Sequence, residues 1–287
     1  MSHEQLPKYV ADQLMNLCLD TIDKTKQALV FCNTKRGAES QAERVSKKVT
    51  LNGEKAERCA VLAEQILGAL ESPTKQCKRL ALCVKNGLAF HHAGLNAKQR
   101  EIIETAFRKS EIFIICCTPT LAMGLDLPAF RSIIRDVKRF TLGKTWGMAH
   151  IPVLEYHQMA GRAGRPGMED FGEAIIVAGS AGEAEDALER YIRGEPEQII
   201  SKLAVEPVLR TYLLSLISTG FIKDRKTMYA FFDKTFYAQQ YADVSKLHII
   251  LDKMLMLLDE WEFIKVIGGD GGSGGIAEVD EFASADA

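Results

Sequence analysis

The chain has 287 residues, 47% of them hydrophobic, which is enough for about two globular domains of the usual size. Its 36 basic and 38 acidic side chains leave a formal charge of −2, which argues against a purely electrostatic nucleic-acid binder. No apolar run approaches the roughly 18 to 20 residues of a membrane span, and no signal peptide begins the chain, so we expect a cytoplasmic protein without a membrane partner.

The seven cysteines form no Cys-x-x-Cys pair, and several lie in apolar runs. This pattern is typical of reduced, buried thiols and not of disulfides or zinc ligands. We therefore expect no metal bound by the chain alone.

The first elements alternate helix and strand. Apolar spacing predicts a helix over 8–22, a buried parallel strand over 28–32 and a helix over 37–48. The residues between this strand and helix, 33–37, stand at the carboxyl end of the strand, where open α/β sheets place their ligands. A helix N-terminus there suits a phosphate, although an ordinary cap with a solvated Lys-Arg pair explains the pattern equally well.

The next segment predicts packing and not chemistry. Residues 53–85 read as two helices divided at Pro73. A strand over 88–90 then ends in His91 and His92, before a helix over 96–108. Adjacent histidines point to opposite sides of an extended chain, so they cannot easily share one metal ion.

A third strong strand over 112–117 leads into the loop 118–128. The hydroxyl of Thr118 can donate to a phosphate at the strand end, and Gly124 would admit a sugar closely. The alternative is that Pro119 and Pro128 merely shape a loop.

Residues 137–150 follow a strand over 131–136 and contain two extended pieces around a glycine turn, which predicts a protruding hairpin. Phe140 and Trp146 lie in this insertion. An aromatic side chain near the tip could stack on a base, an interaction worth about 1 to 3 kcal/mol in single-strand binders. The alternative is a loose insertion with Trp146 packed against the sheet.

The stretch 158–167 carries Arg162 and Arg165 three residues apart, separated by small residues. On a helix this spacing puts both guanidinium groups on one face, open to a bulky anion, before Pro166 and Gly167 end the helix. Arginine binds phosphate oxygens bidentately and stays charged at any working pH. The pattern predicts a polyphosphate site, with surface ion pairs as the alternative.

These motifs resemble those of a known family. Residues 158–167 are similar to motif VI of the Ski-like superfamily 2 helicases, 33–37 to motif IV and 118–128 to motif V, and 91–95 resembles a signature between them. The chain most resembles the archaeal Hjm-type (helicase-308) DNA helicases. The resemblance implies an α/β fold, a RecA-like parallel sheet with flanking helices.

The resemblance also implies roles for particular residues. In the family pattern the two arginines stabilise charge on the γ-phosphate of ATP, a glutamine orients the phosphate or the attacking water, and two motif V residues face the nucleotide. The nucleic-acid backbone is touched by motifs IV and V, and a hairpin between motifs V and VI separates the strands. The arginines and the glutamine match Arg162, Arg165 and Gln158. The nucleotide-facing residues match Gly124 and Asp126, where the family usually has Asn at the second position. The residues that touch the nucleic-acid backbone match Thr34, Arg36 and Thr118, and the hairpin contains Phe140 and Trp146.

The nucleotide-binding half of a helicase motor is missing from the sequence. Gly143, Lys144 and Thr145 suggest a phosphate loop, but Lys138 stands where its first glycine is needed, and Asp259 with Glu260 ends a helical pattern and not a strand. The resemblance implies that ATP with Mg²⁺ is held mainly by a first RecA-like lobe of the same protein. We expect no ATP hydrolysis by this chain alone, and we expect Arg162 and Arg165 to be free of internal ion pairs and to face the sheet edge from which Thr34 and Thr118 emerge.

The last third of the chain reads as a separate domain. A strand over 172–178 closes the first domain and a helix over 183–192 follows it. Helices over 206–218, 224–236 and 244–261, then strands over 263–267 and 276–279, describe a winged helix. Its third helix has few basic residues, so docking against the motor lobe is favoured over groove reading. We predict a RecA-like lobe over 1–195, a winged helix over 196–268 and a flexible glycine-rich turn and acidic tail over 269–287.

The combined interpretation is the second motor lobe and winged helix of an ATP-dependent 3′–5′ DNA helicase that acts on single strands and forks in replication or repair. Three alternatives remain. A Ski-like RNA helicase has nearly the same motor motifs, a RecA-like interaction module would bind nucleic acid or protein without catalysis, and a winged-helix transcription factor would need a basic third helix.

Overall fold

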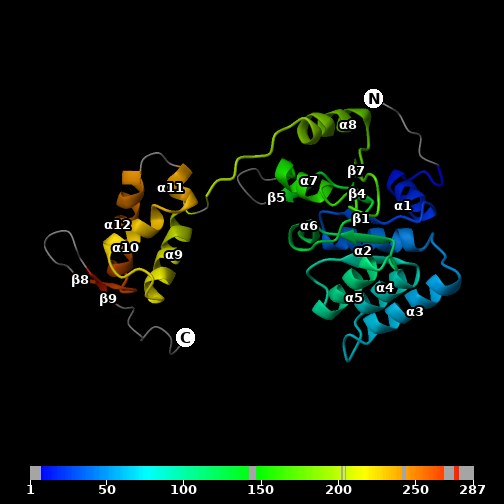
Figure 1. Ribbon diagram of the computed structural model, residues 1–287, viewed down its shortest axis with the longest axis horizontal. Helices are drawn as coiled ribbons and strands as arrows, with labels where there is room; N and C mark the ends of the chain where they lie inside the picture. The colour runs from blue at the N-terminus through cyan, green and yellow to red at the C-terminus, as the bar shows by residue number, and fades with distance from the viewer. Residues whose placement is uncertain are drawn as a thin grey trace. The chain divides into compact units, whose positions relative to one another are not determined.

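The computed structural model describes residues 8–141, 147–201, 203, 205–240, 244–267 and 275–277. The chain divides into two compact units, Met1–Glu197 and Gln198–Ala287, and each has a hydrophobic core of its own (Figure 1). Within the described residues, no helix has the length and apolar character needed to cross a bilayer.

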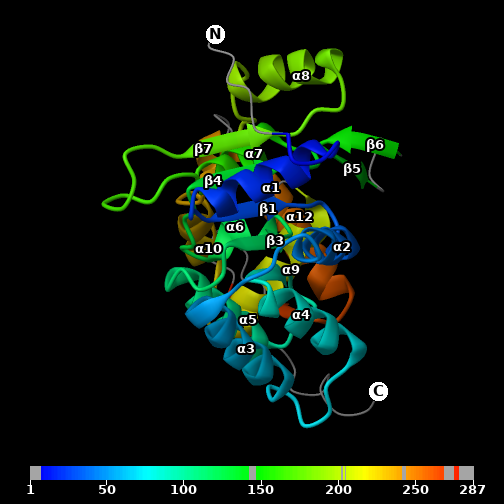
Figure 2. The same cartoon turned by 90° about the vertical axis from the view of Figure 1, so that its right-hand side faces the viewer.

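The first unit is a parallel α/β sheet with flanking helices, as predicted. Its five strands lie in the order β2-β3-β1-β4-β7, all parallel, and Figure 2 shows β7, β4, β1 and β3 in this sequence. Its elements are α1 (Gln13–Asp23), β1 (Ala28–Phe31), α2 (Lys35–Ser46), α3 (Gly53–Leu67), α4 (Lys75–Lys85), β2 (Leu88–His91), α5 (Ala97–Arg108), β3 (Ile114–Cys117), α6 (Thr120–Gly124), β4 (Arg131–Ile134), β5 (Lys138–Thr141), β6 (Gly147–His150), α7 (Val153–Ala160), β7 (Glu173–Ile176), α8 (Ala181–Ala187) and the π-helical turn η1 (Leu188–Ile192).

The strands form where short apolar runs can be buried on both faces of the sheet. Every residue of β1, β2, β3 and β4 is buried, whereas the edge strand β7 is only partly covered. Such continuous apolar runs are the signature of parallel strands covered by helices. The seven cysteines are all buried and free, in agreement with the sequence prediction of reduced thiols.

Arg131, at the start of β4, is a buried charge in this core, with 1% of its side chain exposed. It donates to Asp20 and Thr21 of α1 at 2.6 and 2.9 Å and to Glu173 of β7 at 2.5 Å. A buried guanidinium needs such partners, because unpaired it would keep the full cost of leaving water. These contacts fix α1 and β7 on either side of β4.

The second unit is mostly helical. It contains α9 (Glu206–Ser218), α10 (Arg225–Phe232), α11 (Phe236–Gln240), α12 (Val244–Glu260), and the strands β8 (Lys265–Ile267) and β9 (Gly275–Ala277), which pair antiparallel. The helices enclose a core that includes Leu213, Met228 and Leu251. The glycine-rich segment 268–274 and the tail 278–287, predicted to be flexible, lie outside the described residues.

The predicted single helix over 224–236 is wrong, because the structure has two helices there. Asp224 and Thr227 form a capping box at the start of α10, which ends at Phe232. The Thr235 hydroxyl donates to the Phe232 carbonyl at 2.6 Å and accepts from the Ala238 amide at 3.4 Å, so it closes one helix and opens the next. Local side-chain hydrogen bonding therefore overrides the helical periodicity.

Candidate functional site

Two predicted phosphate-contacting loops emerge side by side at the carboxyl ends of β1 and β3. These strands pair in register, with Phe31 opposite Cys117, so Thr34 and Thr118 leave the sheet at the same edge. The Thr34 hydroxyl caps α2 by accepting from the Gly37 amide at 2.9 Å. A Cβ on residue 37 would lie 2.9 Å from that hydroxyl, so this tight cap needs glycine.

Basic side chains surround this edge. Arg36 is exposed in the first turn of α2. Arg135, which the sequence analysis did not single out, follows β4 at the same edge, and its guanidinium lies 3.4 Å from the position of a Cβ on Gly37. The position of Arg135 near the carboxyl end of a predicted strand is the sequence feature that could have identified it. The N-terminus of α2 and two arginines thus form a surface suited to an anionic backbone.

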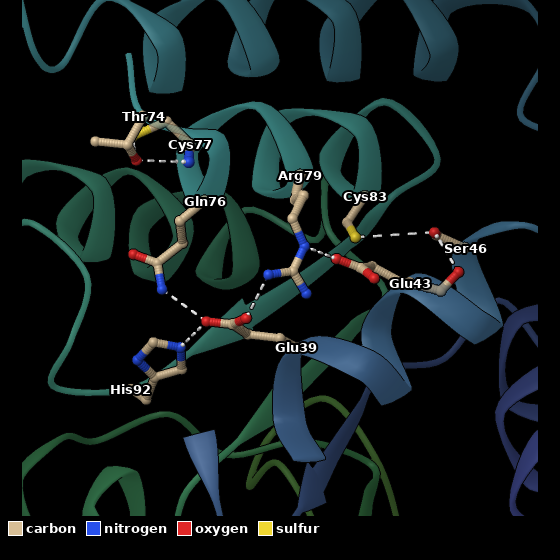
Figure 3. Close-up of polar contacts among 9 residues, drawn as sticks. All are labelled: Glu39, Glu43, Ser46, Thr74, Gln76, Cys77, Arg79, Cys83 and His92. Carbon is tan, nitrogen blue, oxygen red and sulfur yellow. Dashed lines mark hydrogen bonds and ion pairs between the residues drawn. The ribbon is translucent and has the colours of Figure 1, made fainter. Parts of the chain in front are cut away.

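A buried carboxylate, Glu39, holds this edge together (Figure 3). It accepts from Gln76 and Arg79 of α4 at 2.6 and 2.7 Å and from the His92 ring at 3.1 Å. Because the Nδ1 atom of His92 accepts from the Gly94 amide, its Nε2 carries the proton that Glu39 receives. Burial lowers the pKa of His92, which keeps the ring neutral. Burial opposes ionisation of Glu39, but the hydrogen bonds from Gln76 and Arg79 and the charge of Arg79 lower its pKa overall.

His91 is also engaged inside the protein. Its Nε2 lies 2.8 Å from the Glu104 carboxylate, and burial lowers the pKa of this ring. The two histidines therefore bind different carboxylates. Among the described residues, no cluster of three His, Cys, Asp or Glu side chains is arranged to hold a metal.

Residues 161–167, which we call the arginine loop, do not continue helix α7. This differs from the prediction that Arg162 and Arg165 lie on one helical face. Helix α7 ends at Ala160, and Gly164 adopts a φ of +91°, in the region that favours glycine. Instead, Ala163 pairs with Ala129 in a parallel bridge, and the Gly164 amide donates to the Ala129 carbonyl at 2.7 Å. The loop is thus held as an extension of the sheet.

The expected location of the arginine pair is also wrong. Ala129 and Gln27 precede β4 and β1, so the loop lies beside the amino ends of the strands, opposite the edge from which Thr34 and Thr118 emerge. The physical reason is the direction of α7, which follows β4 and packs back along it, so that its last turn reaches the amino ends. The two sets of predicted residues therefore form two separate surfaces.

Arg162 lies with the predicted nucleotide-facing residues. Contrary to the expectation that it would be free of internal ion pairs, its guanidinium forms an ion pair at 3.6 Å with the Asp126 carboxylate, which is 94% exposed, and it donates to the Ala122 carbonyl. Gly124, the last residue of α6, precedes Asp126 by two residues and is exposed, and a Cβ there would meet no atom within 4 Å. The fold itself does not require glycine at this position, which leaves room for a ligand to come close.

Arg165 is bound internally, contrary to the expectation that it would be free. Its guanidinium donates to both oxygens of Glu169, at 2.6 and 3.3 Å, and to Gln27 at 2.5 Å, and only 12% of its side chain is exposed. Burial opposes ionisation of Glu169, but the hydrogen bond and charge of Arg165 lower the pKa of this carboxyl overall. Gln158, in the last turn of α7, is exposed. The sequence analysis missed Glu169, although its i, i+4 spacing from Arg165 was a signal for the pair.

The predicted hairpin over 137–150 is present as β5 and β6, which pair antiparallel (Figure 2), and Arg139 of β5 contacts Glu155 of α7. Phe140 pairs across the strands with Met148, and the two side chains are 56% and 66% exposed. Trp146 belongs to the segment 142–146, outside the described residues. The hairpin therefore presents an exposed apolar pair on one face.

Comparison with known proteins finds similarity to helicases. The helicase conserved C-terminal domain family matches residues 51–167. The chain is 44% identical over 260 residues to the ATP-dependent DNA helicase Hel308 of Methanocella arvoryzae, which covers 90% of this chain and 34% of that protein. It is 39% identical over 259 residues to Hel308 of Methanococcus vannielii (90% and 34%) and 40% identical over 252 residues to Hel308 of Pyrococcus horikoshii (87% and 34%). The chain thus spans about a third of the length of these relatives.

The parallel sheet, its motif loops and these matches define the first unit as a RecA-like lobe that carries the helicase C-terminal domain, in a protein of the superfamily 2 helicases. Within that superfamily, the chain is similar to the Hel308 type over 87 to 90% of its own length.

Proposed function

We propose that this chain supplies the second motor lobe, followed in sequence by a winged helix, of an ATP-dependent 3′–5′ DNA helicase. The observation that carries the proposal is the proximity of Arg162, which is partly exposed, to the exposed residues Gly124 and Asp126, in a chain similar over nine-tenths of its length to ATP-dependent DNA helicases. The second unit, with three main helices and a two-stranded sheet, is compatible with a winged helix.

The residues of this chain fit part of a nucleotide site. Guanidinium groups are suited to phosphate oxygens, whereas the described residues contain no cluster of ligands for Mg²⁺. ATP with Mg²⁺ would therefore be held mainly by a first RecA-like lobe of the same protein, and ATP would supply the phosphoryl group that is transferred to water. Arg162 would hold negative charge on the terminal phosphate, and Gln158 would orient the phosphate or the attacking water.

Arg165 would also have to bind a phosphate in spite of its internal partners. Three of its nitrogens already donate to Glu169 and Gln27, so it has to use its remaining N–H groups or exchange a partner for a phosphate oxygen. Arginines that stabilise the transition state of phosphoryl transfer contribute about 10³- to 10⁵-fold in other nucleotide hydrolases. Glu169 would hold the guanidinium in place until a nucleotide competes for it.

The nucleic acid would bind at the other sheet edge. Thr34, Arg36 and Thr118 would contact its backbone there, with Arg135 as an additional cation beside Thr34. Backbone contacts position a strand without reading its sequence, which suits a helicase. The hairpin, with Phe140 exposed and Trp146 in the segment that joins its strands, would separate the duplex.

The test adds the separately produced first lobe of a Hel308 relative to this chain and measures single-strand-stimulated ATP hydrolysis. Hydrolysis should require both polypeptides and should fall by about 10³-fold or more with Arg162→Ala or Arg165→Ala. Arg193→Ala, which removes a half-exposed surface ion pair with Glu189, is the control and should hydrolyse ATP like the wild type. Wild-type hydrolysis with Arg165→Ala would overturn its assignment.

The internal pairing of Arg165 favours one alternative, a RecA-like module that binds nucleic acid or protein without catalysis. A second experiment separates the alternatives by offering forked DNA and forked RNA, side by side, to the helicase polypeptide that carries this chain and a first lobe. ATP-dependent unwinding of DNA supports the proposal, and unwinding of RNA alone would favour a Ski-like RNA helicase. Binding without hydrolysis or unwinding would favour the module.

A further inference from the structure

The base of the β5–β6 hairpin is closed by a hydrogen bond between its own ends and is attached to the rest of the lobe by Asn33 and Tyr191. The Ile151 amide donates to the Val137 carbonyl at 2.9 Å, and the Asn33 side chain donates to the Lys138 carbonyl at 2.6 Å. The hydroxyl of Tyr191, a fully buried side chain of η1, lies 3.2 and 3.1 Å from the carbonyls of Val137 and Ile151. The hairpin therefore leaves the lobe from a rigid base.

Beyond this base, a side-chain contact ties the first strand of the hairpin to helix α7. Arg139 of β5 donates to the Glu155 carboxylate at 2.7 Å, and the side chains are 40% and 8% exposed. The described residues of β5 and β6 contribute no side chain to the buried core of the lobe. Because β5 is not attached by apolar packing, the ion pair between Arg139 and Glu155 helps to hold it against α7.

Helix α7 connects this contact to the arginine loop within eight residues. Glu155 lies in its first turn, and Arg162 follows its last turn. The Ser132 hydroxyl of β4 donates to the Met159 carbonyl at 2.6 Å, which holds the far end of the helix on the sheet. A short helix held at both ends moves as one body, so a displacement of the arginine loop reaches Glu155.

We propose that Glu155 is a positioning residue that couples the arginine loop to the hairpin, so that a nucleotide-dependent movement of α7 is transmitted to Arg139 and to the apolar face formed by Phe140 and Met148. The inference rests on the proposed function, because it assumes that the arginine loop meets a nucleotide and that the hairpin opens the duplex. Its physical basis is that a nearly buried carboxylate keeps its counterion when the helix moves, since separating them would leave a charge unpaired in the protein.

The test uses the helicase polypeptide that carries this chain and a first lobe, and compares Glu155→Gln, Arg139→Gln and the double variant. DNA-stimulated ATP hydrolysis and unwinding of a forked duplex are measured on the same samples. Each single variant should lose about tenfold or more in base pairs opened per ATP hydrolysed, as expected for the misplacement of a working group by a distant change. The double variant should be no worse than the singles, because both remove the same contact.

Arg58→Gln is the matched control, since it removes an exposed ion pair with Glu54 on α3, and it should keep the wild-type ratio. Arg139→Lys retains the positive charge and should restore part of the ratio. An equal loss of hydrolysis and unwinding in Glu155→Gln and Arg139→Gln would indicate a purely structural role and overturn the inference, as would a wild-type ratio in both. If the wild-type helicase does not unwind DNA at all, the proposed function fails before the variants are compared.

Discussion

At the scale of single residues, the most demanding group is the guanidinium of Arg131. It is almost completely enclosed and joins Asp20, Thr21 and Glu173, which lie on two elements far apart in the sequence. A buried ion pair adds little net stability over an apolar replacement, yet removing one partner alone leaves an uncompensated charge. Loss of the Arg131 side chain should therefore strongly lower the stability of the lobe.

We expect Arg131→Met to lower the free energy of unfolding of the first unit by about 3 to 5 kcal/mol, because Asp20 and Glu173 lose their shared counterion. Chemical denaturation followed by circular dichroism measures this change. Arg44→Met is the control, since its ion pair with Asp12 is much more exposed and should contribute at most about 1 kcal/mol. Equal losses in the two variants would show that burial of Arg131 does not determine its contribution.

At the scale of elements, α7 depends on a residue far along the chain for its start. Pro152 precedes the helix and offers no side-chain cap, but the Glu197 carboxylate accepts from the Val153 amide at 2.8 Å and from the Leu154 amide at 3.1 Å. Those backbone hydrogen bonds lower the pKa of Glu197. A carboxylate is well placed there, because the N-terminus of a helix carries unsatisfied N–H groups and partial positive charge.

Replacing Glu197 with Ala should expose the two amides of α7 to water. We expect faster hydrogen exchange at Val153 and Leu154, which amide-resolved exchange measurements would detect. Glu195→Ala is the control, because it alters the same linker without removing this cap. Unchanged protection of both amides in Glu197→Ala would mean that the cap does not hold the start of α7.

The elements also show where sequence reasoning succeeds and where it stops. The apolar runs predicted the parallel sheet, and the neighbouring positions of Thr34 and Thr118 followed from the rule that parallel strands end at a common edge. The end of α7 could not be predicted, because it depends on the bridge between Ala163 and Ala129. The contact of Arg165 with Gln27 could not be predicted either, since Gln27 lies 138 residues away and only the folded chain brings it close.

At the scale of the whole molecule, the division after Glu197 gives the chain two independent cores. The predicted boundary at residue 195 is close to this division, while the winged-helix character of the second unit stays a proposal. Units with separate cores can unfold separately, so that a single unfolding free energy does not describe the chain. Stability measurements should therefore resolve two transitions.

Calorimetry should detect two unfolding transitions, and a cavity in one core should affect one of them. Leu213→Ala removes a fully buried side chain of the second unit and should lower the stability of that unit alone by about 2 to 5 kcal/mol. Leu29→Ala, equally buried in β1, should act only on the other transition. A single cooperative transition shifted by both substitutions would contradict the independence of the units.

The two proposed binding surfaces lie at opposite ends of β1, and their separation limits how one can affect the other. Arg165 reaches Gln27 before the strand and Thr34 follows it, and four residues of strand span about 13 Å. This length exceeds the Debye length of about 8 Å at physiological ionic strength, so exposed charge gained at one end is mostly screened at the other. Coupling between the nucleotide site and the nucleic-acid site would then have to act through displacement of rigid elements. Added salt should therefore weaken nucleic-acid binding without abolishing this coupling.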